Sequence, residues 1–214
     1  MSEYIEIFRE ISELLQKGKA RDIVGSVQKA LDAGAQPADI LQNALMDGMS
    51  IIGDKFKKNE VFVPEVLIAA RAMNKATETL KPHLAKAGVQ PVGKAIICTV
   101  RGDQHDIGKN LVKMMIEGKG IEVEDLGVDC DTQYVVNKVK EGSAKVLCLS
   151  ALLTTTMSVQ KEVINALAEA GVRDKIKVMV GGAPVTQGFA DEIGADAYTP
   201  DAATAAEVCR RFYE

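Results

Sequence analysis

Hydrophobic residues recur every three to four positions through the first 87 residues, which predicts helices throughout that half of the chain. One apolar stripe ends at Gly18 and a second ends at Gly34, and glycine is a favoured residue at helix ends. Pro37 suits the first turn of a third helix, and Pro64 opens a fourth. The residues that the fourth helix should turn inward are Leu67, Ala70, Met73, Ala76 and Leu80. Four helices with short connections predict a four-helix bundle over residues 1–88.

The pattern changes at residues 89–93, where glycine and proline interrupt it and predict a linker. From residue 94 to residue 214, apolar runs alternate with segments of helical periodicity. The expected strands are 94–100, 121–126, 145–150, 176–181 and 196–199. Continuous apolar runs such as Val146-Leu147-Cys148-Leu149 are typical of a parallel sheet that is covered on both faces. We therefore expect an α/β fold in which a five-stranded, doubly wound parallel sheet follows the helical bundle.

Composition and charge narrow the class of protein. Of the 214 residues, 47% are hydrophobic and 26% are charged, as in ordinary globular proteins, and the net charge of −4 favours neither nucleic acid nor an anionic membrane as a partner. No apolar run approaches the ~20 residues that span a bilayer, and the acidic, amphipathic N-terminus is unlike a secretory signal, so we expect a cytoplasmic location. The four cysteines form no Cys-x-x-Cys pair, which argues against a zinc site and favours reduced, buried thiols.

A polar motif follows the first expected strand: Gly102-Asp103-Gln104-His105-Asp106-Ile107-Gly108. His105 therefore lies on a strand-to-helix loop, where α/β proteins build ligand sites. Asp103 is placed to accept the second ring N–H of His105, which fixes the tautomer and strengthens the other nitrogen as a metal ligand. The glycines at 102 and 108 let the backbone approach a ligand closely. A loop histidine can also be a plain surface residue, so the choice depends on the later motifs.

Two further motifs follow the third and fourth expected strands. The third strand leads into Ser150-Ala151-Leu152-Leu153-Thr154-Thr155-Thr156. Its last threonines could bind a ligand or could simply cap the next helix. The fourth strand leads into Gly181-Gly182-Ala183-Pro184, which is either a tight turn or the wall of a slot, with proline in the first turn of the next helix. Hydroxyls and helix N-terminal amides near such a slot could hold a phosphate.

The three motifs, in this order, resemble the cobalamin-binding motifs of cobalamin-dependent methionine synthase. The whole chain, with its helical half, resembles more closely the small corrinoid proteins of anaerobic methyltransferase systems, which serve methylamines, methanol or quaternary amines. The resemblance implies a helical cap over residues 1–88, a linker over 89–93, and a flavodoxin-like, Rossmann-like cobalamin-binding domain over 94–214. It also implies a corrinoid cofactor, either cobalamin or methylcobalamin.

The resemblance assigns a role to each matching residue. His105 would bind cobalt as the lower axial ligand, Asp103 would orient it, and Thr156 would complete the relay in a position where serine is common. Ser150 and Thr154 would bind the nucleotide tail, Gly182 would line its slot, and Ala202 would contact it near the rim. Phe62, in Val61-Phe62-Val63-Pro64-Glu65, would shield the upper face, although it could also be a bundle-core aromatic. The remaining expected cofactor contacts are Gly102, Gln104, Asp106, Ile107, Gly108, Leu152 and Gly181. His83 matches no motif, and we expect it near the end of the fourth helix.

The implied function is that of a methyl carrier and not of an enzyme. A substrate-specific methyltransferase would place a methyl group on cobalt(I), and a second methyltransferase would pass it to a thiol or to a folate or pterin acceptor. A reductive activase would restore the reduced cofactor. The alternatives are a cobalamin-binding subunit of a mutase, a cobalamin-dependent sensor or regulator, and a phosphoacceptor receiver domain. The missing tryptophan and the acidic charge weigh against a DNA-binding sensor.

Overall fold

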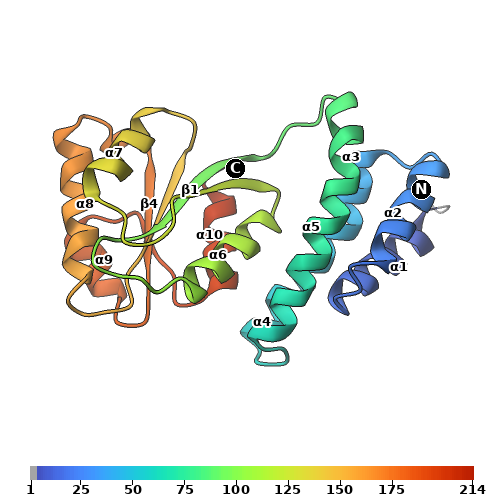
Figure 1. The fold of residues 1–214 in the computed structure, drawn as a ribbon, viewed down its shortest axis with the longest axis horizontal. Helices are drawn as coiled ribbons and strands as arrows, with labels where there is room; N and C mark the ends of the chain where they lie inside the picture. Colours follow the sequence, from blue (N-terminus) through green and yellow to red (C-terminus); the bar gives the residue numbers. More distant parts are fainter. Residues whose placement is uncertain (1–3) are drawn as a thin grey trace. The chain divides into compact units, whose positions relative to one another are not determined.

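The computed structural model describes residues 4–214, and its first half is helical (Figure 1). The helices are α1 (Ile5–Gln16), α2 (Asp22–Asp32), α3 (Pro37–Ile40), η1 (Leu41–Met46), α4 (Asp47–Lys57) and α5 (Val63–Lys86). The segments α3, η1 and α4 follow one another without a break, and η1 is π-helical. Together they form the third of the four helices expected from the periodicity.

The bundle core consists of aliphatic side chains that the apolar stripes place on one face of each helix. The largest of those that are fully buried are Ile11, Leu15, Ile23, Ile40, Leu45, Ile52 and Leu80. The inward orientation expected for Leu67 is wrong, because this side chain is 39% exposed. Its neighbour Val66 is buried instead, and one residue along a helix turns the side chain by about 100°.

The chain divides into two units. The first extends to Pro91 and includes Gly118–Gly120, and the second comprises Val92–Glu117 and Ile121–Glu214. No helix within residues 4–214 is both long and apolar enough to cross a membrane.

The second unit is a parallel α/β sheet of five strands, as expected. The strands are β1 (Gly93–Thr99), β2 (Ile121–Asp125), β3 (Val146–Ser150), β4 (Lys177–Gly181) and β5 (Ala197–Tyr198). The helices that follow them are α6 (Ile107–Glu117), α7 (Thr132–Lys140), α8 (Met157–Glu169), α9 (Gln187–Ile193) and α10 (Ala202–Arg211), with a short 3-10 helix, η2 (Arg173–Lys175), before β4. The strand order is β2-β1-β3-β4-β5, which is the flavodoxin-like order.

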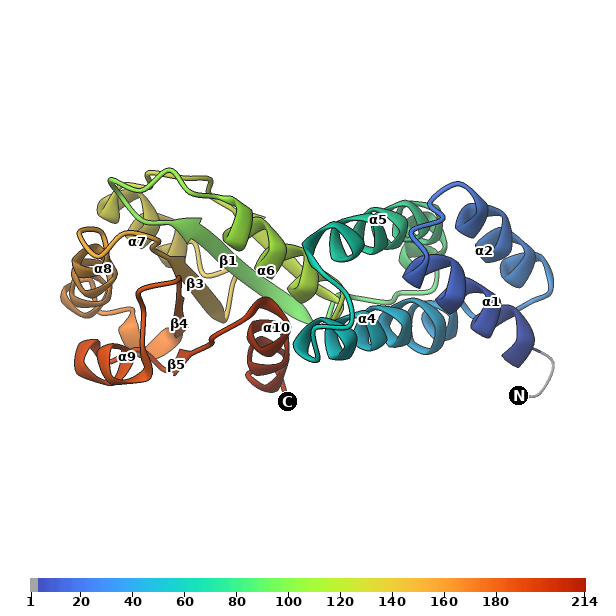
Figure 2. The ribbon, with the colours of Figure 1, turned by 90° about the horizontal axis from the view of Figure 1, so that it is seen from below.

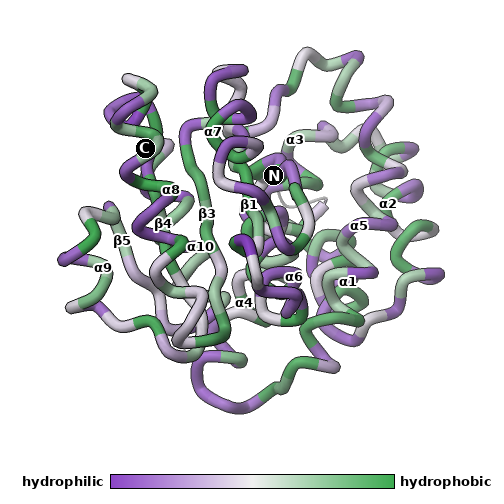
Figure 3. Tube along the Cα trace, turned by 60° about the vertical axis from the view of Figure 1, so that its left-hand side comes forward, coloured by the Kyte–Doolittle hydropathy of each residue, from purple (hydrophilic) through white to green (hydrophobic). Residues whose placement is uncertain are grey.

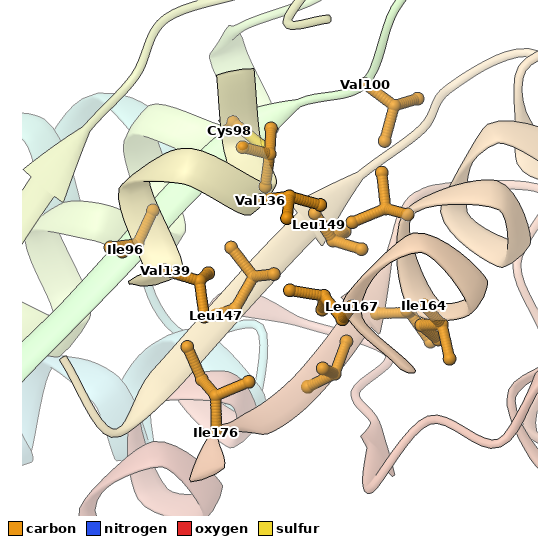
Figure 4. Packing of buried hydrophobic residues seen from close by; sticks show 14 of the residues in the cluster. Ile96, Cys98, Val100, Val136, Val139, Leu147, Leu149, Ile164, Leu167 and Ile176 are labelled. Atoms are coloured by element: carbon orange, nitrogen blue, oxygen red, sulfur yellow. The ribbon is translucent and has the colours of Figure 1, made fainter. Parts of the chain in front are cut away.

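The helices cover both faces of this sheet (Figure 2). Helices α6 and α10 pack together on one face, whereas α7, α8 and α9 lie on the other. Alternate strand residues such as Ile96 and Leu147 face α7 and α8 in one hydrophobic core cluster (Figure 4), which also includes Val178. Because both faces are buried, β3 is hydrophobic along almost its whole length (Figure 3).

The register of the sheet aligns the ends of three strands. Thr99 at the end of β1 pairs with Ser150 at the end of β3, and Ser150 pairs with Gly181 at the end of β4. The loops that carry the three sequence motifs therefore leave the sheet at one level, beside the switch point between β1 and β3, where such folds bind ligands.

Candidate functional site

The loop after β1 presents His105 at the carboxyl edge of the sheet. Gly102 has a φ of +82°, a left-handed conformation that glycine adopts without strain, and it turns the chain just before Asp103. The side chain of His105 is 53% exposed, whereas that of Asp103 is completely buried. The loop thus combines an accessible imidazole with an inaccessible carboxylate.

The carboxylate of Asp103 joins the first and second motifs. Its Oδ1 accepts hydrogen bonds from the ring Nδ1 of His105 at 2.7 Å and from the backbone N–H of His105 at 3.1 Å. Its Oδ2 accepts from the backbone N–H groups of Leu152 at 2.7 Å and Leu153 at 3.3 Å. The hydroxyl of Thr156 lies 2.8 Å from the same oxygen. Five donors therefore converge on one buried carboxylate.

These contacts decide the charge of Asp103 and the tautomer of His105. Burial alone would raise the pKa of Asp103, but the hydrogen bonds from His105, Leu152 and Thr156 outweigh it and hold the pKa well below its ordinary value. An ionised carboxylate can only accept, so Nδ1 of His105 carries the proton in this contact. The Nε2 atom is then left with its lone pair, which is the form of histidine that binds a metal.

The capping alternative for Thr156 is wrong. Thr156 occupies the N-cap position of α8, but its side chain makes no capping hydrogen bond to the helix. Its hydroxyl lies between Asp103 Oδ2 and the carbonyl oxygen of Leu153, which is 2.9 Å away. The threonine therefore belongs to the carboxylate and histidine network.

Exposed apolar side chains gather on the loops that surround His105. The α/β unit exposes six large hydrophobic residues by at least 37%, and four of them lie on the loops after β2 and β3 or at the start of α6. These four are Ile107 at 75%, Val128 at 37%, and Leu152 and Leu153 at 41% each. Large apolar groups gathered on one edge are typical of a ligand surface. We call these four residues the apolar rim.

The other expected contacts lie at the ends of β3, β4 and the start of α10. Ser150 is half-buried and Thr154 is exposed, and neither hydroxyl has a hydrogen-bond partner within residues 4–214. Both can therefore donate to a ligand. Gly181 pairs with Ser150 in the sheet, and Ala202 is buried at the first position of α10.

Position 182 accepts only glycine, because the backbone of another loop lies where a side chain would begin. Its φ is +129°, and a Cβ at this position would lie 1.8 Å from the carbonyl oxygen of Ala151. The loops after β3 and β4 can approach each other only because this side chain is missing. Around Gly108, by contrast, a Cβ would meet nothing within 4 Å.

Two local expectations need correction. Pro184 does not lie in the first turn of a helix, because α9 begins only at Gln187, where the side chain of Thr186 accepts from the N–H of Phe189. Phe62 is not a bundle-core aromatic, because it is 62% exposed at the N-cap position of α5.

The remaining motif residues, Gln104 and Asp106, are exposed on the His105 loop, and Asp106 accepts a hydrogen bond from Asn110.

Sequence reasoning missed contacts that support the His105 loop. The backbone N–H of Leu153 and the side chains of Thr99 and Asp129 all bond to it. None belongs to a residue type that marks a site by itself. The pairing of β1 with its neighbours brings Leu153 and Asp129 into place, whereas Thr99 is reached when the loop turns back toward the end of β1.

Protein side chains within residues 4–214 do not form a metal site of their own around His105. Among the described residues, 4–214, no group of three or more histidine, cysteine, aspartate or glutamate side chains could hold a metal ion. A metal bound through His105 must therefore bring most of its ligands with it, as in a macrocycle. The apolar rim would suit the face of such a macrocycle.

Comparison with known proteins agrees with this geometry. A B12 binding domain family matches residues 93–209, which is more than half of the chain, and a second B12 binding domain family matches residues 7–81. Dimethylamine corrinoid protein 1 of Methanosarcina mazei is 41% identical over 201 residues, which cover 94% of this chain and 93% of that protein. The chain belongs to the family of B12-binding corrinoid proteins. Monomethylamine corrinoid protein 2 of Methanosarcina acetivorans is 42% identical over 207 residues, or 95% of each chain.

Solved structures of corrinoid proteins share the fold. The methanol:cobalamin methyltransferase complex of Methanosarcina barkeri contains a chain that matches with a TM-score of 0.88 at 32% identity, covering 98% of this chain and 80% of that one. A cobalamin-binding protein from Desulfitobacterium hafniense matches with a TM-score of 0.81 at 30% identity, covering 96% and 98%.

The residues of this corrinoid protein fit its cofactor. His105 presents a single metal-binding nitrogen, the apolar rim surrounds it, and Ser150 and Thr154 hold unused hydroxyls one loop away. A corrinoid needs one protein ligand because its ring supplies the equatorial ones. The donor set of the site matches that requirement.

Proposed function

We propose that this corrinoid protein is a methyl carrier whose cobalt is bound by Nε2 of His105. The observation that carries the proposal is the buried Asp103 carboxylate, which holds Nδ1 at 2.7 Å and leaves Nε2 accessible on a half-exposed ring. When bound, the corrinoid supplies a cobalt centre that accepts a methyl group and gives it up again. The mutase and sensor alternatives are not favoured, because the relatives named above are methylamine corrinoid proteins.

In this mechanism the protein residues would control one metal ligand and its orientation. His105 would hold the metal through Nε2 and would let it go where the bound corrinoid needs one ligand fewer. Asp103 keeps the released ring in place through Nδ1, and the hydrogen bonds from Leu152 and Thr156 keep the carboxylate ionised.

The other expected contacts would complete the binding site. Ser150 and Thr154 would donate to the nucleotide tail, Gly181 and Gly182 would leave room for it, and Ala202 would contact it. Gly102, Gln104, Asp106, Ile107, Gly108 and Leu152 would surround the ring near His105. These assignments rest on the position of each residue at the carboxyl edge of the sheet.

The helical unit would act as a cap, joined by a hinge in residues 89–93. We propose that Phe62 covers the methyl-bearing face, because burying a phenyl ring that is now 62% exposed against an apolar surface would lower the free energy. Phe62→Ala should make the bound cofactor react faster with an added small oxidant. Ile5→Ala, which removes another exposed side chain of the same unit, is the control and should leave the rate unchanged. An equal rate in wild type and Phe62→Ala would refute the assignment.

The chain would not catalyse methyl transfer by itself. Its partners would be a substrate-specific methyltransferase, a second methyltransferase with a thiol or a folate or pterin acceptor, and a reductive activase. Support for a methyltransferase partner comes from the structural match within the methanol:cobalamin methyltransferase complex. Methylamines are the donors that the names of the sequence relatives suggest.

The ligation is tested by the electron paramagnetic resonance spectrum of the corrinoid-loaded protein in the cobalt(II) state. Protein labelled with nitrogen-15 histidine should change the nitrogen splitting, and His105→Ala should lose that splitting and retain the corrinoid more weakly. His83→Ala, which removes the other histidine, is the control and should keep it. A nitrogen splitting that is the same with and without the label would refute ligation by histidine. Failure to bind any corrinoid would refute the proposed function.

A further inference from the structure

The main chain of the His105 loop is held from a second side, away from Asp103. Thr99 is the last residue of β1 and is completely buried, and its hydroxyl donates to the backbone carbonyl of His105 at 2.8 Å. The backbone of Thr99 is fixed in turn by the loop after β2. Its N–H donates to the carbonyl of Gly127 at 3.0 Å, and its carbonyl accepts from Cys130 at 3.1 Å. Every polar group of Thr99 is therefore engaged.

Asp129, on the same loop after β2, supports the start of the His105 loop. Its Oδ1 accepts from the N–H of Gly102 at 2.6 Å, and its own N–H donates to the backbone carbonyl of Asp103 at 2.9 Å. Asp129 has a φ of +52°, an uncommon conformation for a residue other than glycine. Such conformations persist where surrounding contacts hold them, and they cluster at functional sites.

We propose that Thr99 is a positioning residue for the axial histidine, with Asp129 as its second support. The two side chains fix the main chain on either side of Asp103, while the Asp103 carboxylate fixes the imidazole ring. Nε2 of His105 then stays in one place whether or not it is bound to the metal. This inference rests on the proposed function, because it assumes that His105 alternates between bound and released states.

The consequence is a stronger bond between His105 and the metal. A preorganised ligand does not lose conformational freedom when it binds, and the loss of an outer support of a metal ligand typically weakens the site about 10- to 100-fold. We expect Thr99→Val, which keeps the volume but lacks the hydroxyl, to weaken histidine binding about tenfold. Histidine binds cobalt(II) better than cobalt(I), so a weaker bond makes reduction easier. A tenfold loss raises the cobalt(II)/cobalt(I) midpoint potential by about 59 mV.

The experiment compares paired variants of the full, corrinoid-loaded chain. Thr99→Val and Asp129→Gly each remove one support, and glycine takes a positive φ without strain. Thr99→Ser and Asp129→Asn keep the donor and the acceptor and should restore wild-type behaviour. Ser26→Ala removes a buried hydroxyl that bonds to Glu10 in the helical unit, so it controls for a general loss of stability.

Three measurements are made on each variant: the fraction of cobalt(II) with a label-sensitive histidine splitting, the midpoint potential, and the exchange rate of the His105 amide in the cofactor-free protein. The inference expects a smaller fraction, a higher potential and faster exchange in Thr99→Val and Asp129→Gly only. Wild-type ligation and potential in both variants would overturn it, even if their stability falls. Asp129 is exposed, so Asp129→Gly remains informative if Thr99→Val does not fold. If the nitrogen splitting of the wild-type protein does not change with the label, the proposed ligation by His105 is itself wrong, which is a separate outcome from failure of this inference.

Discussion

Replacing Asp103 by asparagine tests how strongly the site depends on a charged, buried acceptor. The carboxylate is completely buried and receives hydrogen bonds on both oxygens. An asparagine amide keeps one oxygen and replaces the other by an NH2 group. If that group faces Leu152 and Leu153, it meets two backbone donors, and if it faces His105, it meets the backbone N–H and disfavours the protonated Nδ1 tautomer. Neither orientation satisfies the site.

The magnitude follows from the number of bonds lost. A hydrogen bond to a charged group contributes about 1.5–3 kcal/mol, and at least two of the five are lost in either orientation. We therefore expect Asp103→Asn to lower the free energy of unfolding of the α/β unit by about 4 kcal/mol, which is a large share of the total of about 5–15 kcal/mol typical of a protein. Corrinoid ligation by His105 should be lost with it.

The assay is urea unfolding of the cofactor-free protein at several pH values. The pKa of Asp103 is lower in the folded state than in the unfolded state, so its stabilising contribution is full above about pH 4 and is lost as the pH falls below that. The difference between wild type and Asp103→Asn should therefore be largest at neutral pH and shrink in acid. Asp39→Asn, an exposed carboxylate in α3, should change stability by less than about 0.5 kcal/mol. A loss below about 1 kcal/mol for Asp103→Asn at pH 7 would refute the reasoning.

Two further predictions concern the scaffold. Gly182→Ala should lower the free energy of unfolding by at least about 2 kcal/mol and weaken corrinoid retention, because the new Cβ would meet the Ala151 carbonyl at a position with positive φ. The control is Gly188→Ala, which has open space around it in α9 and should not destabilise the protein in thermal unfolding. Equal melting temperatures of the two variants would contradict this prediction. The pKa of Asp196 is lowered, because hydrogen bonds from Val178, Lys177 and Arg173 outweigh its burial. The loss of unfolding free energy in Asp196→Asn should therefore be present at pH 6 and shrink below about pH 4. A difference between wild type and variant that stays constant from pH 6 to pH 3 would count against this prediction.

The sequence predicts most of the fold because its periodicity reports burial. The five strands lie within one residue of their expected bounds, since a doubly covered strand such as β3 is apolar along almost its whole length. Leu67 and Pro184 were placed wrongly because the exact phase of a helix and its first residue depend on neighbours. Thr186, and not the proline, decides where α9 begins.

The site could be predicted in part. The pairing of Asp103 with His105 is local and follows from their spacing. The contact of Thr99 could not be predicted although it lies only six residues before His105, because it depends on how the intervening loop turns back. The role of Asp129 could not be predicted, because this residue lies 27 positions from Gly102 on a loop that meets β1 only in the folded sheet. The same holds for Gly182, whose need for a missing side chain arises from the backbone of another loop.

The alignment of the three strand ends also makes binding of the metal depend on folding of the sheet. Asp103 and Thr156 are 53 residues apart in the chain, and they meet only after β1 and β3 have paired in the observed register. A nascent or partly folded chain carries His105 without a fully formed acceptor network, so its imidazole has no fixed tautomer and no preferred direction. Competence to bind the cofactor therefore requires that β1 and β3 have paired, so cofactor uptake can report that this part of the sheet has formed.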